Sequence, residues 1–292
     1  MLEILLHNWL VFAVLSASGV GLFSFVNKIS VEREHSERLT LVFLYINQII
    51  FSFIAVLLFS KFSFNGRTFL IAVASGSLLV LVFKSRFIAL KYLDTSVYFT
   101  NFRIFSSTML LFIGVLFFGD DLSVKEITGF ILGVIIFLLL IERSRMDNQK
   151  YKKALRALLV GIAGITLFGV IMKVVSIGDV DIYNFIFYQS LVAFFFTLFL
   201  FRESIFRSTT YQEENSAEIF KFSIFQAFIQ VINPLLFLHA LSLGADLGIG
   251  YKVLSYSILI PIILSIIIYK EKVNKRKIVA FILAIISLWF FI

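Results

Sequence analysis

Apolar residues in this 292-residue chain come in long runs and do not alternate with polar residues. The stretches 11–25, 39–59, 69–83 and 127–141 contain no charged side chain. An α-helix of roughly 20 apolar residues is long enough to cross the hydrocarbon core of a bilayer, whereas a membrane β-barrel would need shorter, alternating segments. The pattern therefore predicts an all-α, polytopic membrane protein.

Breaks that contain charged residues, Gly or Asp divide the chain into about ten such segments. We expect spans at 8–30, 39–60, 67–90, 96–118, 124–142, 154–177, 181–201, 219–242, 247–269 and 274–292. The basic stretch 143–153 lies between the fifth and sixth spans and is predicted to be a cytoplasmic linker. It would join a first five-helix unit, residues 1–142, to a second, residues 154–292.

The two units resemble each other in sequence. The aligned features are Gly19–Lys28 with Gly164–Lys173 (164 − 19 = 145), and Ala89, Leu90 and Asp120 with Ala240, Leu241 and Glu271 (240 − 89 = 151). Because each unit has an odd number of spans, the second must enter the membrane in the opposite orientation. The sequence therefore predicts two inverted five-helix repeats, an arrangement typical of secondary transporters.

Cations are unevenly distributed over the connections of this topology. With the N-terminus outside, the outer connections hold three, namely Lys61, Arg67 and Lys125, and the cytoplasmic side holds 17. Those 17 are Arg33, Arg38, Lys91, Arg143, Arg145, Lys150, Lys152, Lys153, Arg156, Arg202, Arg207, Lys221, Lys270, Lys272, Lys275, Arg276 and Lys277. Because Lys and Arg are retained on the cytoplasmic side, we expect a multi-pass protein of the cell membrane with both termini non-cytoplasmic.

Composition narrows the range of partners. A net charge of +8 would suggest nucleic acid in a soluble protein, but here the cations flank membrane spans, so the expected partner is the lipid bilayer and not nucleic acid. The chain has no cysteine, and its histidines, His7, His35 and His239, are scattered, so no metal site and no cofactor are expected. We expect a monomer, and no pattern identifies a coupling ion.

Six cations fall within predicted spans: Lys28, Lys84, Arg86, Arg103, Lys173 and Lys252. None of the 18 acidic residues lies deep in a span, so these cations have no obvious counter-ion. A charge inside the bilayer is costly, and such residues either reach the headgroups or face a cavity or pathway.

Position within the span separates these two outcomes. Lys28, Arg86 and Lys173 lie close enough to helix ends for their side chains to reach the headgroups, and Lys84 fits either outcome. Arg103 and Lys252 lie deeper. We expect these two to face a cavity, with an anion bound between them.

Small residues four positions apart recur in the last span of each unit. Gly129 and Gly133 lie in 124–142, and Ala280 and Ala284 occupy the matching positions in 274–292. Such pairs allow helices to approach closely. We therefore predict that both pairs are packing sites.

The closing part of each unit has a common plan: an Ala-Leu pair, a turn, a fourth span, an acidic turn and a fifth span. Residues 89–140 and 240–291 carry it, with Gly119-Asp120 and Lys270-Glu271 at the acidic turns. This plan resembles the drug/metabolite transporter superfamily, EamA type. The resemblance implies a ten-helix transporter, not an enzyme, that alternates access around a site near the repeat interface.

A finer likeness concerns two short motifs. Gly248-Ile-Gly-Tyr-Lys252 resembles the Gly-Ala-Leu-Asn-Lys motif of Golgi nucleotide-sugar carriers, and Phe187-Tyr188-Gln189-Ser190 resembles their Phe-Tyr-Asn-Asn motif. Triose-phosphate carriers also place a Lys in the helix of Lys252. The likeness implies that Lys252 meets a phosphate or sugar and that Tyr188 meets a base. Tyr251 replaces the first motif's Asn, and Gln189 and Ser190 replace both Asn residues of the second.

The expected function is transport of a small polar, anionic metabolite of the sugar-phosphate or nucleotide-sugar type. Lys252 and Arg103 are expected to contact the anionic group. The further candidates for lining the substrate site are Tyr188, Gln189, Asn101, Tyr251 and Lys84. Two alternatives stay open: an amino-acid or drug exporter of the same fold, and an integral-membrane transferase, which would need an acid, a His or a metal site at a membrane face.

Overall fold

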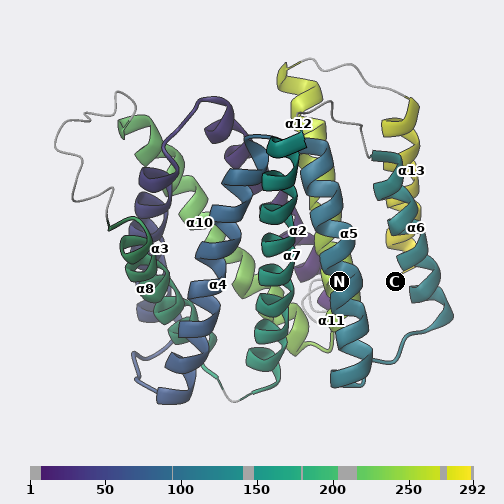
Figure 1. Ribbon diagram of the computed structural model, residues 1–292. Helices are drawn as coiled ribbons and strands as arrows, with labels where there is room; N and C mark the ends of the chain where they lie inside the picture. The colour runs from purple at the N-terminus through teal and green to yellow at the C-terminus, as the bar shows by residue number, and fades with distance from the viewer. Residues whose placement is uncertain are drawn as a thin grey trace.

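The computed structural model describes residues 8–93, 95–140, 148–178, 180–202, 216–269 and 275–290, which form a bundle of helices with no strand among them (Figure 1). The α-helices are α2 (Trp9–Glu32), α3 (Glu37–Phe59), α4 (Gly66–Leu90), α5 (Thr95–Ile113), α6 (Val124–Leu140), α7 (Asn148–Ile177), α8 (Ile182–Leu200), α10 (Ser216–Ser242), α11 (Leu247–Ser255), α12 (Leu259–Tyr269) and α13 (Lys275–Trp289). The prediction of an all-α fold class is confirmed for these residues.

Seven segments are long and apolar enough to cross a membrane. They are Trp9–Glu32, Glu37–Phe59, Gly66–Leu90, Asn101–Phe118, Gln149–Ile177, Ile182–Leu200 and Ser216–Ser242. Large apolar side chains such as Leu58 and Phe117 are exposed on the outside of the bundle, as expected of a surface that faces lipid. The chain is therefore a multi-pass membrane protein, while the count of ten spans stays a prediction.

Two of the predicted spans depart from a regular α-helix. Span 96–118 ends in a π-helix, η1 (Gly114–Phe118), which closes at Gly119 with a φ of +68°, a conformation favourable for glycine. Span 247–269 is divided into α11 and α12 by a 3₁₀ turn, η2 (Tyr256–Ile258). Pro261 has no N–H to donate to the carbonyl of Ser257, which weakens the helix at this turn.

Polar residues at the helix starts satisfy backbone N–H groups that have no partner within the helix. The side chain of Asn65 accepts from the N–H groups of the first turn of α4, and Asp181 does the same for α8. At the start of α6, Ser123 and Glu126 form a reciprocal capping box: each side chain accepts from the other's backbone N–H, at 3.2 and 2.8 Å. These caps lie outside the long apolar runs.

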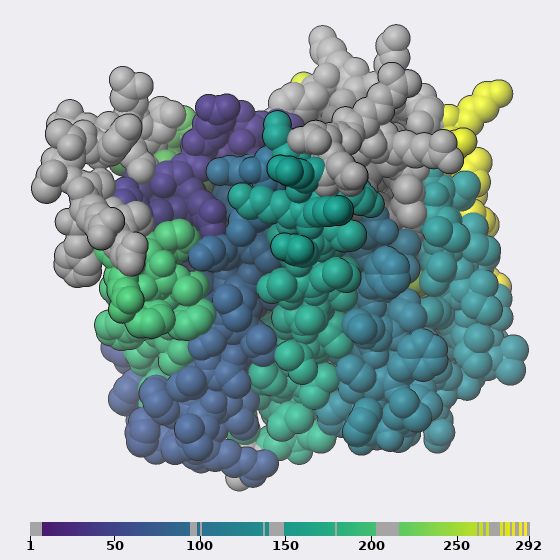
Figure 2. Space-filling view, in the orientation of Figure 1, coloured from purple at the N-terminus to yellow at the C-terminus, as the bar shows by residue number. Residues whose placement is uncertain are grey.

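Helices far apart in the sequence pack side by side. Helix α2 packs against α10, and α4 packs against α7 and α8. Helices α4 and α7 lie next to each other on the face shown in Figure 2. Helices α6 and α13 pack together at one edge of the bundle (Figure 1). This arrangement surrounds a central cavity with α2, α4, α5, α7, α10 and α11.

Candidate functional site

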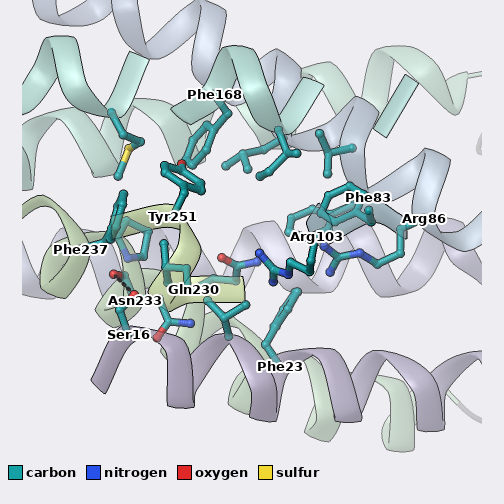
Figure 3. A pocket seen from close by; sticks show the side chains of 18 residues that line it. Ser16, Phe23, Phe83, Arg86, Arg103, Phe168, Gln230, Asn233, Phe237 and Tyr251 are labelled. Atoms are coloured by element: carbon teal, nitrogen blue, oxygen red, sulfur yellow. Dashed lines mark hydrogen bonds between the residues drawn. The ribbon is translucent and has the colours of Figure 1, made fainter. Parts of the chain in front are cut away.

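The central cavity has a volume of about 100 Å³, which is room for several water molecules or one small anionic group. Its polar lining residues are Ser16, Arg86, Arg103, Gln230, Asn233 and Tyr251. Its aromatic lining residues are Phe23, Phe83, Phe102, Phe168 and Phe237. Figure 3 shows the two guanidinium groups next to each other on one side of the cavity, with Gln230, Asn233 and Ser16 on the other.

Arg86 reaches the cavity because it lies on the packed face of α4. Leu79, Val82 and Phe83 precede it at helical spacing and line the same cavity. Its side chain is buried, with an exposed fraction of 6%. The guanidinium carbon lies 5.2 Å from the ring centroid of Phe83 and 5.7 Å from that of Phe102, within the range of cation–π attraction.

Arg103 enters the cavity from α5 and is equally buried, with an exposed fraction of 6%. Its guanidinium carbon lies 5.7 Å from the ring centroid of Phe102. None of the described residues that line the cavity is acidic. Burying two like charges together is costly unless a counter-charge accompanies them. The arrangement is therefore suited to an anionic ligand.

The opposite side of the cavity offers uncharged hydrogen-bonding groups from α10. The Ser16 hydroxyl of α2 donates to the backbone carbonyl of Asn233 at 3.0 Å, so this bond does not use the Asn233 side-chain amide. Pro234 has no N–H, so the carbonyl of Gln230 lacks its usual helical donor. These groups complement the hydroxyl or amide groups of a polar ligand.

The structure brings together two of the residues singled out from the sequence and separates a third. Arg103 and Tyr251 both line the cavity. Lys252 does not: it is 0% exposed, and its Nζ lies 4.3 Å from the ring centroid of Phe130 on α6. Successive residues of an α-helix point about 100° apart, so Tyr251 and Lys252 face different neighbours. No anion held at this cavity lies between Arg103 and Lys252.

The other four candidates also lie away from the cavity. The Tyr188 hydroxyl donates to the carbonyl of Ser63 at 2.8 Å, in the connection between α3 and α4. Gln189 is buried, and its amide has no hydrogen-bond partner among the described residues. Asn101 lines a separate hollow between α5 and α7, and Lys84 lines a groove between α4 and α7.

Two of the cations expected to reach the headgroups are placed differently. Arg86 lines the cavity, and Lys173 is buried beside Asp120, with 3.6 Å between Nζ and Oδ1. The expectation that the intramembrane cations lack a counter-ion is therefore wrong for Lys173. A signal for Arg86 was present in the sequence, since the small residues Ala72, Ser75 and Gly76 mark the packed face of α4 that continues to Arg86.

Gly133, which is predicted to be a packing site, has a specific neighbour in the structure. A β-carbon at this position would lie 2.1 Å from Cε of Lys252 and 2.9 Å from the Tyr256 hydroxyl. Gly133 therefore makes room for side chains of α11 and η2, not for a second helix backbone. The carbonyl of Gly129 accepts from Ser287 of α13 at 2.6 Å. The side chain of Ala284 lies outside the described residues.

Comparisons with known proteins bear on the fold alone. No family model matches the chain. No curated protein matches it either. The chain is similar to a protein of known crystal structure, with a TM-score of 0.73 and 10% sequence identity, over 95% of this chain and 97% of that one. At this identity the likeness establishes a shared fold and carries no activity across.

Proposed function

We propose that this protein is a secondary transporter of a small organic anion, and that the central cavity is its substrate site. The observation that carries the proposal is the burial of Arg86 and Arg103 in a cavity whose described lining has no acid. An Arg presents a planar fork of donors that matches a carboxylate or a phosphate. Two such forks on one side and amides on the other suit an anion that also carries polar groups.

The cavity lining supports a site at the interface of two repeats. Fourteen of its 18 residues form seven pairs at the offsets read from the sequence, 145 for α2 with α7 and 151 for α4 and α5 with α10 and α11. The pairs are Val20/Ile165, Phe23/Phe168, Leu79/Gln230, Val82/Asn233, Phe83/Pro234, Arg86/Phe237 and Arg103/Leu254. Corresponding positions of both units therefore surround one cavity, as expected of inverted repeats.

Helix packing supports the same relation. In the predicted repeat, α2 corresponds to α7 and α10 corresponds to α4. The packing of α2 against α10 is therefore equivalent to the packing of α7 against α4. A β-carbon at Gly19 would lie 2.0 Å from Oδ1 of Asn233, and one at Gly164 would lie 2.7 Å from Cγ2 of Val82. Gly19 aligns with Gly164 and Val82 with Asn233, so these two close contacts are equivalent. Two such similar units can exchange conformations, which is the basis of alternating access.

The pairs also differ chemically, so that the two units give the site two different sides. The first unit contributes the cations Arg86 and Arg103 where the second has Phe237 and Leu254. The second unit contributes Gln230 and Asn233 where the first has Leu79 and Val82. We infer that the anionic group of the substrate binds to the first unit and its uncharged polar part to the second. The volume favours a small metabolite over a nucleotide-sugar. The resemblance to EamA-type transporters agrees with this function.

The test is ligand-induced thermal stabilisation of the purified protein, because a ligand that binds only the folded state raises Tm. The panel holds small mono- and dicarboxylates, sugar phosphates, amino acids and amines. We expect an anionic member to stabilise wild type. Arg86→Gln and Arg103→Gln should each weaken its binding about ten-fold or more, since a charge-assisted pair is worth about 1.5–3 kcal/mol. Lys91→Gln, at the exposed end of α4, is the matched control and should bind as wild type does.

Lys252→Met distinguishes an anion site formed by Arg86 and Arg103 from the site expected from the sequence, in which Lys252 contacts the anion. Because Lys252 faces α6, we expect the variant to bind the anion within about two-fold of wild type. A ten-fold loss of anion affinity in this variant would show that Lys252 contacts the substrate. Stabilisation by neutral or cationic ligands alone, unaffected by Arg86→Gln and Arg103→Gln, would overturn the anion proposal in favour of an amino-acid or drug exporter.

A further inference from the structure

A second hollow lies on the outside of the bundle, in the groove between α4 and α7. It has a volume of about 640 Å³, much larger than the central cavity. Its α4 side includes Lys84 and Ser85, and its α7 side includes Lys152, Lys153 and Arg156. None of these residues belongs to the substrate site. The groove follows the two helices that are visible side by side in Figure 2.

The α7 side of the groove changes from basic to apolar along the helix. Lys152, Lys153 and Arg156 are spaced so that they share one face, and Ala157 and Val160 continue that face by one further turn. The basic part lies near the start of α7 at Asn148, at the end of the predicted span. A ligand that follows this face would therefore meet cations first and then apolar side chains.

The apolar part of the groove opens to the lipid-facing surface. Val160 is 53% exposed, and Leu81 on the α4 side is 37% exposed. The next residue before Val160, Leu159, is also exposed. In a membrane-spanning helix, these side chains face acyl chains and not water. The occupant must therefore have an apolar part that lies in the membrane, which a soluble metabolite lacks.

The charge of the groove favours an anionic occupant. Four of its ten lining residues are cations, and none of the described residues that line it is acidic. Glu37, at the start of α3, interacts electrostatically with Lys84 but does not line the groove. Lys153 Nζ lies 5.7 Å from the ring centroid of Tyr92. Lys152 and Arg156 line the groove, and no acid is among its described lining residues. Basic pockets between transmembrane helices are suited to the phosphates of anionic lipids.

We propose that the α4–α7 groove is a binding site for an anionic phospholipid, with its phosphate among Lys84, Lys152, Lys153 and Arg156 and an acyl chain along Leu81 and Val160. The lipid would link α4 to α7 from outside the bundle. These helices also carry Arg86 and Phe168 of the central cavity. The lipid site is independent of the proposed transport function, so either proposal can fail without the other.

The test uses protein purified in a non-ionic detergent and stripped of lipid. Phosphatidylglycerol is added, with phosphatidylcholine as the zwitterionic control, and bound lipid is counted by native mass spectrometry while Tm is measured in parallel. We expect phosphatidylglycerol to bind at least ten-fold more tightly than phosphatidylcholine and to raise Tm more. Inorganic phosphate and glycerophosphoglycerol, which carry the anion without acyl chains, should leave Tm unchanged.

The variant is Lys152→Gln/Lys153→Gln/Arg156→Gln, whose three side chains are exposed in the described part of the chain. Each removed cation should weaken phosphatidylglycerol binding about five-fold, which is about 1 kcal/mol at 1.4 kcal/mol per decade. The control, Lys61→Gln/Arg67→Gln/Lys125→Gln, removes the same charge from the other end of the bundle and should bind lipid as wild type does. Should the triple variant fail to fold, Arg156→Gln alone supplies the comparison.

Three outcomes would overturn the proposal. Equal binding of phosphatidylcholine and phosphatidylglycerol would show that charge does not matter. Stabilisation by inorganic phosphate of the same size would show a soluble-anion site instead of a lipid site. Equal loss of lipid in the variant and in the control would show a general effect of net charge and not a site at α4 and α7.

Discussion

Lys173 Nζ lies 3.6 Å from Asp120 Oδ1, with both side chains largely buried at exposed fractions of 11% and 6%. The second carboxylate oxygen of Asp120 accepts from the backbone N–H of Leu247 at 2.7 Å. Lys173 also donates to the carbonyl of Ala245 at 3.1 Å. The pair therefore joins α7 and the segment after η1 to the start of α11. Asp120 caps α11 from a distance, because the N-cap residue Asp246 makes no side-chain cap.

Asp120→Ala should lower the stability of the protein strongly. The substitution leaves the Lys173 amine buried without its ion-pair partner and removes the acceptor of the Leu247 N–H. Breaking a buried ion pair from one side costs about 3–5 kcal/mol. Denaturant unfolding in detergent measures this change. Asp121→Ala, at the exposed neighbouring position, is the control and should change the free energy of unfolding by less than about 0.5 kcal/mol. Equal effects of the two substitutions would refute the assigned role.

Asp246 should make stability dependent on pH. It lies in the connection between α10 and α11, where burial and the negative charges of Asp120, Glu126 and Asp121 raise the pKa of its carboxyl to about 6, against the opposing charge of Lys173. The folded protein therefore binds this proton more tightly than the unfolded chain. The contribution of Asp246 to stability is accordingly greatest at low pH and declines as pH rises from about 4 to about 6.

Asp246→Asn removes this charge at every pH. We expect the variant to have a higher Tm than wild type at about pH 7.5 and a clearly smaller excess at about pH 4.5, where the wild-type carboxyl is mostly protonated in the folded state. Thermal melts of both proteins at the two pH values provide the measurement. A difference in Tm that is the same at both pH values would show that the Asp246 carboxyl does not titrate in this range.

Gly133 and Lys252 should be energetically coupled. A methyl group at Gly133 would lie 2.1 Å from Cε of Lys252, so Gly133→Ala must displace a fully buried side chain. Overpacking of this kind costs about 1–3 kcal/mol. Lys252→Ala removes the atoms that clash, and a double-mutant cycle should therefore give a coupling of at least about 1 kcal/mol. Strictly additive effects on the free energy of unfolding would mean that the two residues do not touch.

The predicted topology can be tested by cysteine labelling, because the chain contains no cysteine. Ser63→Cys lies in the connection between α3 and α4, on the predicted outer side, and Lys150→Cys lies at the start of α7, on the predicted cytoplasmic side. Both positions are exposed. A membrane-impermeant maleimide should label Cys at position 63 in intact cells, and that at position 150 only after permeabilisation. The reverse pattern would invert the topology inferred from the 17-to-3 distribution of cations.

The sequence alone was sufficient for the helical fold class, for a physical reason that acts locally. A backbone in hydrocarbon must satisfy its hydrogen bonds within the segment, so a long apolar run becomes a helix whatever its neighbours are. The repeat offsets of 145 and 151 were also readable, because they compare residues without reference to contacts. The repeat itself stays a prediction, and Val82 and Asn233, which the second offset pairs, both line the central cavity.

Only the tertiary structure decided which cations line the central cavity. Lys84 and Arg86 are two residues apart on α4, yet one lines an outer groove and the other the central cavity. Lys252 and Tyr251 diverge in the same way on α11. Depth in a span is a local property, but the direction of a side chain matters only relative to helices that pack beside it. For Arg86 those helices include α2 and α5, whose Phe23 and Phe102 rings have centroids 5.9 and 5.7 Å from its guanidinium carbon.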